Sequence, residues 1–197
     1  MQRSSNIRPG LSTLQAGRAF AAAAVVLYHL NVAYFGNPEY FPQGFFSPFS
    51  MGYAGVEFFF VLSGFIILLV HQSDIGRPGT LGPFAMKRFL RVYPPLWVVL
   101  AGLVVLYALI PTMGGPDVRD PAGALATFLL VPAPTETLLG VAWTLRHEVM
   151  FYAVFAFLLL NRRVGAAVMA VWMSACAAYL GLLLSGFAEE FPLSFIL

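Results

Sequence analysis

Two ionisable side chains, Arg18 and His29, stand in the first long apolar stretch of the chain. They are eleven residues apart, which on an α-helix is within about 20° of whole turns and about 16 Å along the axis, so they share one face. The alanines at 19 and 21–24 would let a neighbouring helix approach closely. Ionisable groups in such a helix are costly and indicate function. The alternative is an Arg18 that extends to the membrane interface and a His29 that is a satisfied core residue.

A second candidate group is the R-x-x-R pair of Arg88 and Arg91, with Lys87 beside it. Side chains three residues apart on a helix point the same way. Such a pair can bind phosphate groups through paired hydrogen bonds. The alternative is that these residues only mark the cytoplasmic side of a membrane helix.

A third group opens a later apolar stretch, in the run W-T-L-R-H-E at 143–148. Glu148 and Tyr152 are four residues apart and share a helix face. A carboxylate there could orient a histidine or bind a sugar hydroxyl. The alternative is a charge pair near the interface, with Arg146 or a similar residue. Glu57 presents a similar choice, and we interpret it as an interfacial anchor.

The remaining histidines and the single cysteine offer less chemistry. We interpret His71 and His147 as loop or interface residues, and three scattered histidines without a carboxylate at ligand spacing predict no metal site. One cysteine, Cys176, makes neither an intramolecular disulfide nor a cysteine metal site. It lies among apolar residues and is not expected to be a nucleophile.

The elements that position these residues must be membrane helices. The chain is 59% hydrophobic and 10% charged, whereas soluble domains carry about 25% charged residues. A water-soluble fold of this size could not bury so much apolar surface. The net charge of +2 is too small to indicate nucleic-acid binding. We therefore predict an all-α, polytopic transmembrane bundle of five or six spans in a lipid bilayer.

The apolar runs predict spans at 14–35, 52–70, 92–110, 141–160 and 164–187, and residues 191–197 resemble the start of another segment. We expect 71–91 to be a loop, with Pro94 and Pro95 at the start of the third helix. The run 122–131 is short for a span. A re-entrant or interfacial segment is favoured there, and a full crossing is the alternative.

The distribution of Lys and Arg predicts the orientation. The N-terminus, with Arg3 and Arg8, and the 71–91 stretch are basic and should be cytoplasmic, whereas the 36–50 loop has no Lys or Arg. A re-entrant 122–131 would also place Arg162 and Arg163 inside. A signal peptide is not expected, because no clean cleavage site follows the first apolar run and more spans come after it.

Four blocks in order carry a family resemblance. They read L-Q-A-G-R-A at 14–19 running to V-L-Y-H at 26–29, G-V-E-F-F-F-V-L-S-G-F at 55–65, K-R-F-L-R-V-Y-P-P-L-W at 87–97 and W-T-L-R-H-E-V-M-F-Y at 143–152. With them the chain resembles the membrane-bound acyltransferase-3 family, and most of all the branch that acetylates bacterial exopolysaccharide.

The family's motifs fall on residues already singled out. The family's first motif is a basic residue followed, after ten residues, by a histidine, and Arg18 and His29 match it. The family's R-x-x-R motif matches Arg88 and Arg91. Its W-[ST]-L-x-x-E motif ends on Glu148. Some members have Asp where this chain has Gln15 and Glu57. The family core has more spans, so we expect residues 1–197 to be the N-terminal part of one membrane acyltransferase domain, and its activity as such stays open.

The resemblance implies transfer of an acyl group, most commonly acetyl, from cytoplasmic acyl-CoA to a carbohydrate hydroxyl. His29 would be the general base, because a neutral imidazole accepts a proton near pH 7, and Glu148 would orient the base or the acceptor. Arg88 and Arg91, with Arg18 as a further candidate, would hold the CoA phosphates.

The cavity-lining residues implied for the substrate are Tyr28, Ser63, Trp143 and Tyr152. No permanently bound cofactor is expected, with acyl-CoA (acetyl-CoA above all) as the donor. The acceptor could be exopolysaccharide, the O-antigen of lipopolysaccharide, peptidoglycan or a small molecule. Direct transfer and an acyl-histidine intermediate both stay open.

Two competing interpretations remain at this point. One is a catalytically inactive fragment of the family with intact motifs. The other is a transporter or assembly partner in which Arg18, His29 and Glu148 form a proton relay. In each case the protein is expected to be a multi-pass protein of the bacterial inner membrane with a cytoplasmic N-terminus.

Overall fold

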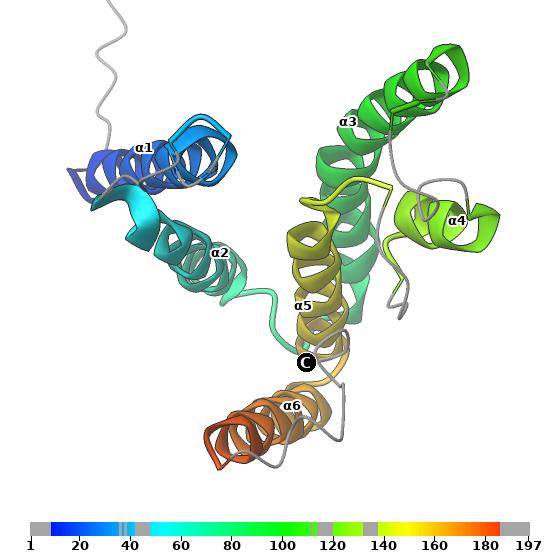
Figure 1. Ribbon diagram of the computed structural model, residues 1–197. Helices are drawn as coiled ribbons and strands as arrows, with labels where there is room; N and C mark the ends of the chain where they lie inside the picture. The colour runs from blue at the N-terminus through cyan, green and yellow to red at the C-terminus, as the bar shows by residue number, and fades with distance from the viewer. Residues whose placement is uncertain are drawn as a thin grey trace, which may run out of the picture. The chain divides into compact units, whose positions relative to one another are not determined.

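The structure, a computed structural model, describes residues 9–35, 37, 39–41, 48–110, 112–113, 120–131 and 138–185. The described residues form helices and contain no strand, which confirms the all-α prediction. In chain order the elements are α1 (Pro9–Leu30), η1 (Asn31–Phe35), η2 (Pro48–Tyr53), α2 (Ala54–His71), η3 (Pro78–Thr80), α3 (Leu81–Leu109), α4 (Pro121–Leu129), α5 (Ala142–Leu160) and α6 (Arg162–Leu184) (Figure 1). The chain divides into two compact units, Met1–Gln72 and Ser73–Leu197, and each is described by itself.

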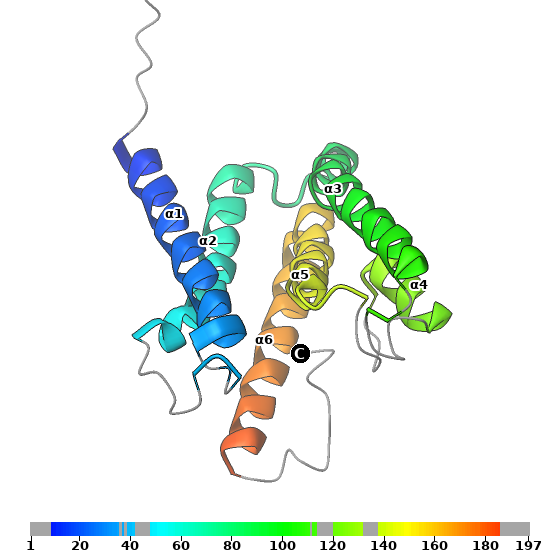
Figure 2. The ribbon, with the colours of Figure 1, turned by 45° about the horizontal axis from the view of Figure 1, so that its top comes forward.

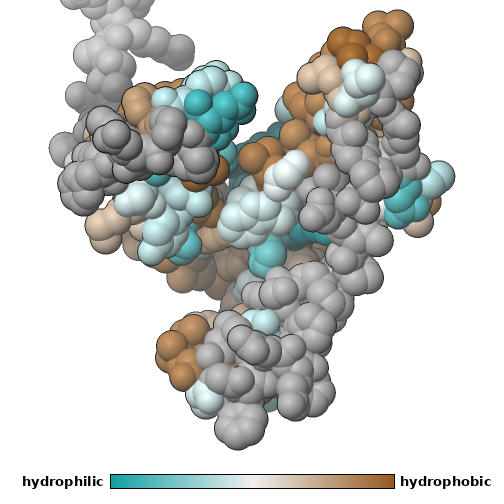
Figure 3. All heavy atoms as spheres, in the orientation of Figure 1, coloured by the Kyte–Doolittle hydropathy of each residue, from teal (hydrophilic) through white to brown (hydrophobic). Residues whose placement is uncertain are grey.

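Five helices of the described residues are long and apolar enough to cross a membrane. They cover Thr13–Phe35, Phe49–His71, Pro78–Leu109, Ala142–Leu160 and Arg162–Leu182. Many large apolar side chains along them face outward, and Val98 and Leu109 of α3 are each 75% exposed. Figure 3 shows apolar side chains gathered over the upper part of α3. In a bilayer such side chains contact lipid rather than water, which confirms the prediction of a multi-span membrane protein.

The prediction for the third span was wrong at its start. The helix α3 begins at Leu81, so the R-x-x-R pair lies on the helix and not in a loop, and Pro94 and Pro95 lie inside it. Proline removes a backbone hydrogen bond, but membrane helices tolerate it because neighbouring groups satisfy the freed carbonyls. The connection from α2 is correspondingly short. Its Gly76 has a φ of 77° and donates to the carbonyl of Leu158 at 2.9 Å.

The first unit is held together by a seam of small residues between α1 on one side and η2 and the start of α2 on the other. A Cβ on Gly52 would lie 2.2 Å from the carbonyl oxygen of Ala24, and one on Gly55 would lie 2.7 Å from that of Ala21. Ala21 is 3% exposed. Small residues let membrane helices approach closely, as predicted for the alanines of the first span. The contacts also fix α1 and α2 as antiparallel.

The second unit contains a tight hairpin of α5 and α6. Asn161 caps α6, because its Oδ1 accepts from the amides of Arg163 at 2.9 Å and Val164 at 3.2 Å. A Cβ on Gly165 would lie 2.3 Å from the Cα of Leu158, so only glycine fits where the two helices meet. Figure 2 shows α6 leaving the end of α5 and α3 beside α5.

The short helix α4 cannot cross a bilayer. Its nine residues span about 14 Å, less than half of a hydrocarbon core of about 30 Å. A full crossing at 122–131 is therefore excluded. Asp120 caps the start of α4 by accepting from the amides of Ala122 and Gly123, at 3.1 and 2.8 Å. Leu130, at a left-handed φ of 53°, ends the helix.

Candidate functional site

The antiparallel contact between α3 and α5 brings the R-x-x-R pair beside Glu148. Nη2 of Arg91 lies 3.9 Å from Oε1 of Glu148. About two turns away along α3, the ring of Phe84 lies 5.6 Å from that of Phe155. The side chain of Glu148 is 19% exposed and that of Arg91 is 47% exposed. The acid is thus largely enclosed, and the arginine retains an accessible surface.

Tyr152 and Arg88 complete this group. The hydroxyl of Tyr152 donates to Oε1 of Glu148, the oxygen that also faces Arg91. The guanidinium carbon of Arg88 lies 5.2 Å from the centroid of the Tyr152 ring and 5.3 Å from that of Phe84. These distances are those of cation–π contacts. We call Arg88, Arg91, Glu148 and Tyr152 the α3–α5 cluster.

The α3–α5 cluster has the composition of an oxyanion-binding site. Its two arginines and one carboxylate leave an excess of one positive charge. A single carboxylate oxygen occupies part of the donor capacity of Arg91, which has five N–H donors. The rings of Phe84 and Tyr152 lie over the guanidinium group of Arg88. An arginine pair of this kind could bind phosphate oxygens while Glu148 stays paired with Arg91.

In the first unit, His29 is held in one tautomer. Its Nδ1 lies 2.8 Å from the carbonyl oxygen of Val25, and because a carbonyl only accepts, Nδ1 must carry the proton. In the neutral ring, Nε2 is then the atom that can accept a proton. The Tyr28 ring lies edge-on to the His29 ring at 5.6 Å, and Tyr53 lies 6.1 Å from Tyr28. The π-helix η1 begins two residues later, a feature frequent at functional sites.

The helix α1 is continuous through Arg18 and His29, so both side chains lie on one face, as predicted. The side chain of His29 is exposed within the described residues and that of Arg18 is intermediate. Gly17, the neighbour of Arg18, contacts Phe58 in the seam with α2. Successive residues are about 100° apart around a helix axis, so the face shared by Arg18 and His29 lies beside that seam.

Ser63 is not brought to His29. The seam pairs Gly52 with Ala24 and Gly55 with Ala21, so each step along α2 moves back along α1. On that register Ser63 is about 24 Å along the axis from the level of His29. Because α1 and α2 run antiparallel, Ser63 lies at a different level of the first unit from His29, and its role in lining the substrate cavity stays a prediction.

Trp143 lies outside the α3–α5 cluster. Five residues before Glu148, it is about 140° away around α5. Its ring is 5.8 Å from that of His147 and it is 47% exposed. Its motif neighbour Glu148 thus shares a sequence pattern with it but not a face of the helix.

The structure changes two expectations, the place of His71 and the partner of Glu148. His71, expected in a loop or at the interface, is the last residue of α2 and is 9% exposed, which excludes the loop and leaves the interface as the expected place. The partner of Glu148 is Arg91, not Arg146, which is two residues away and so about 160° around the helix. Arg146 is itself buried, with 6% exposure.

The sequence reasoning did not assign a role to Tyr93 and Trp97. The hydroxyl of Tyr93 donates to the carbonyl of Leu129 at 3.0 Å, and Nε1 of Trp97 donates to that of Phe128 at 2.9 Å. Both side chains thus satisfy carbonyls at the end of α4. The sequence does carry a signal for this role: Phe89, Tyr93 and Trp97 follow one another at intervals of four residues and so share one face of α3. The ring of Phe89 stacks on that of Tyr93 at 4.9 Å.

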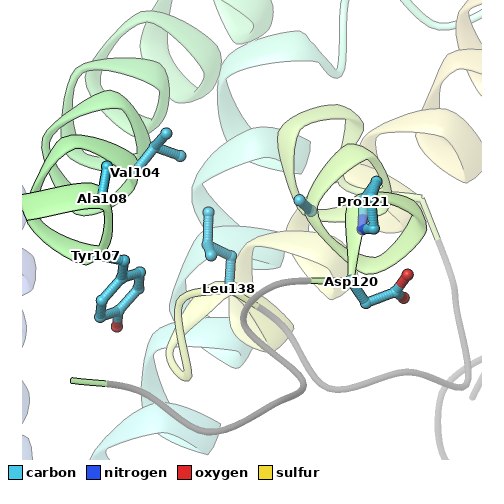
Figure 4. Close-up of a pocket in the computed structure, with 7 residues that line it drawn as sticks. Val104, Tyr107, Ala108, Asp120, Pro121 and Leu138 are labelled. Carbon is cyan, nitrogen blue, oxygen red and sulfur yellow. The ribbon is translucent and has the colours of Figure 1, made fainter. Parts of the chain in front are cut away.

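A cavity of about 350 Å³ lies further along α3, between that helix and the start of α4 (Figure 4). Its lining is mostly apolar and consists of Val104, Tyr107, Ala108, Asp120, Pro121, Ala124 and Leu138. Its carboxylate, Asp120, is already used to cap α4. The cavity is lined by none of the α3–α5 cluster and adds no group for acid–base chemistry.

The fold and the site define a class of protein: a multi-span helical membrane protein with arginines, a carboxylate and a histidine within its spans. The family model described as "Acyltransferase domain" matches residues 11–197, and the chain belongs to this acyltransferase family. This confirms the resemblance seen in the sequence.

Three relatives are similar to this chain and support its membership of the family. The chain is 34% identical to the exopolysaccharide production protein ExoZ of Rhizobium meliloti over 55% of its own length and 34% of that protein. It is 31% identical to the peptidoglycan O-acetyltransferase OatA of Listeria monocytogenes over 72% of its length and 23% of that protein. The acyltransferase MdmB of Streptomyces mycarofaciens is 28% identical over 74% of the chain and 38% of that protein. The matches therefore span between about a quarter and two fifths of these relatives. No solved structure matches the chain.

Proposed function

We propose that this protein is an integral membrane O-acyltransferase that moves an acetyl group from cytoplasmic acetyl-CoA to a carbohydrate hydroxyl. The observation that carries the proposal is the α3–α5 cluster, in which the R-x-x-R pair meets the glutamate of the W-T-L-x-x-E motif. Membership of the acyltransferase family supports the reaction class. The names of two relatives, one concerned with exopolysaccharide and one with peptidoglycan, support a carbohydrate acceptor.

The donor would be held by its phosphates. Arg88 and Arg91 both lie in the first three turns of α3, near the end of the helix that the positive-inside rule assigns to the cytoplasm. Guanidinium groups bind phosphate through two parallel hydrogen bonds. Arg18 on α1 is a further candidate for this role. CoA enters and leaves as a substrate, so no resident cofactor is needed.

The chemical step would use His29 as general base. Nε2 would accept the proton of the sugar hydroxyl as its oxygen attacks the thioester carbonyl carbon. The C–S bond then breaks, the acetyl group stays on the sugar, and the CoA thiolate takes the proton back from the imidazolium. The hydrogen bond from Nδ1 to Val25 leaves Nε2 as the accepting atom, which is the tautomer that this step requires.

Glu148 would orient the reacting groups. Its contacts with Arg91 and Tyr152 both involve Oε1. Oε2 is then the oxygen that could accept a hydrogen bond from an acceptor hydroxyl or from an imidazole. Tyr152 and Arg91 would hold the carboxylate in place for that contact.

The donor assignment can be tested by comparing acetyl-CoA with S-acetylpantetheine, which carries the same thioester without the phosphates. The full-length protein would be assayed as wild type and with Arg88→Ala or Arg91→Ala. Loss of a charge-assisted contact worth about 1.5–3 kcal/mol should raise the KM for acetyl-CoA about tenfold or more. The KM for S-acetylpantetheine should change little.

Arg163→Ala is the matched control, because Arg163 is an exposed arginine at the start of α6. It should leave both KM values unchanged. An acetyl-CoA KM that stays at the wild-type value in both cluster variants would contradict the donor assignment.

A further inference from the structure

Arg146 is a buried arginine that the proposed reaction does not use. It lies in the second turn of α5 and is 6% exposed. Its Nε and Nη2 atoms are buried, and neither makes a hydrogen bond. In the described part of the chain, Glu148 forms an ion pair with Arg91, which lies on the opposite side of α5 from Arg146.

A buried guanidinium without a partner is costly, because removing an ion from water costs several kcal/mol unless a counter-charge or hydrogen bonds compensate. The local helix adds to the positive potential. The N-terminus of α5 has no acidic residue in its first turn, and Val141 at the N-cap makes no side-chain capping hydrogen bond. The helix dipole places further positive potential there. The surroundings of Arg146 thus favour an anion.

The two unpaired atoms identify the kind of anion. Nε and Nη2 lie on the same edge of the guanidinium group. This edge holds a carboxylate or a phosphate through two parallel hydrogen bonds, whereas a small spherical anion uses only part of it. Both atoms are buried together, so the whole edge is directed into the protein.

We infer that Arg146 and the N-terminus of α5 form an oxyanion-binding subsite, and that its ligand is a carboxylate or phosphate carried by the carbohydrate acceptor. This inference rests on the proposed function for the choice of the acceptor over the donor. The α3–α5 cluster is assigned to the donor phosphates, and Arg146 faces about 160° away from it around α5.

The test uses Arg146→Met, which keeps much of the volume without the donors, and Arg146→Lys, which keeps the charge without the paired edge. Arg163→Met is the matched control. The melting temperature of each full-length protein is measured in detergent without substrates. Binding is then measured for three probes: a glucuronate-containing disaccharide, its neutral glucose-containing counterpart and glucose 1-phosphate.

We expect Arg146→Met to melt at the wild-type temperature or above, because it removes an unpaired buried charge. One anionic probe should bind at least about tenfold more weakly to Arg146→Met than to wild type, with Arg146→Lys in between. Whichever anionic probe responds distinguishes a sugar carboxylate from a sugar phosphate. Binding of the neutral probe and the KM for acetyl-CoA should not respond to either substitution.

Three outcomes would overturn the subsite. The first is a clear fall in the melting temperature of ligand-free Arg146→Met, which would mean that the chain itself pairs with Arg146. The second is that both anionic probes bind wild type and Arg146→Met equally well. The third is that neither anionic probe binds to wild type. A wild-type protein that binds an anionic probe through Arg146 but transfers no acetyl group would refute the proposed function and leave the subsite standing.

Discussion

At the scale of single residues, Glu148 is the side chain with the most defined surroundings in the α3–α5 cluster. One of its oxygens receives the Tyr152 hydroxyl and faces the Arg91 guanidinium. Tyr152 is in turn covered by Arg88. Each member of the cluster thus fixes the next, which is how a site holds a reacting group in a single rotamer.

This arrangement predicts that Tyr152→Phe lowers the turnover number about tenfold, because one charge-assisted hydrogen bond to Glu148 is worth about 1.5–3 kcal/mol. Glu148→Gln should lower it further. The measurement is kcat at saturating acetyl-CoA, with Tyr179→Phe on α6 as the control tyrosine. Wild-type turnover in Tyr152→Phe would show that the hydroxyl has no part in positioning Glu148.

The sequence could predict the members of this cluster but not all of its contacts. The spacing of four residues places Tyr152 with Glu148, and the spacing of three places Arg88 with Arg91. That Arg91 would be the partner of Glu148 depends on the register between α3 and α5, which spacing within one helix does not determine. Trp143 belongs to the same motif as Glu148, but the helix geometry places the two side chains on different faces of α5.

At the scale of elements, α4 is fixed by side chains from another helix. Tyr93 and Trp97 of α3 satisfy the carbonyls of Leu129 and Phe128. Within the helix, Thr127 is fully buried, donates to Gly123 and accepts from the amide of Leu138. Helix ends need such partners, because the last four carbonyls have none within the helix.

Tyr93→Phe should therefore loosen the end of α4. Losing one hydrogen bond costs about 0.5–1.5 kcal/mol, which should speed amide exchange of peptides covering 120–131 several-fold. Hydrogen–deuterium exchange followed by mass spectrometry measures this directly, with peptides from α5 as the internal reference. Tyr179→Phe, a tyrosine on α6, is the control variant. Exchange at 120–131 that is the same in Tyr93→Phe and wild type would contradict the role given to Tyr93.

Most element boundaries could be predicted because apolar length determines them. The second predicted span, 52–70, corresponds to α2 at Ala54–His71, and 141–160 corresponds to α5 at Ala142–Leu160. The start of α3 was missed because adjacent prolines resemble a helix start, whereas here they lie mid-helix. The tyrosine and tryptophan that position α4 act over more than thirty residues, a separation at which local patterns carry no information.

At the scale of the whole molecule, the chain joins two helical units, one with His29 and one with the α3–α5 cluster. The family match covers both without a break, from residue 11 to residue 197. Composition alone predicts the membrane location, because so few charged residues cannot cover a soluble protein. The central proposal is that this family member transfers an acyl group and that His29 is the base of the transfer.

The most direct test is the transfer itself, measured in membranes that contain the full-length protein and are supplied with labelled acetyl-CoA. The variants are His29→Ala and, as control, His147→Ala, whose Nδ1 likewise bonds the carbonyl four residues before it, at 2.8 Å. We predict label in the glycan fraction for wild type and His147→Ala, and a loss of about a hundredfold or more in His29→Ala at equal membrane insertion. Unchanged transfer in His29→Ala, or no label from well-inserted wild-type protein, would contradict the account.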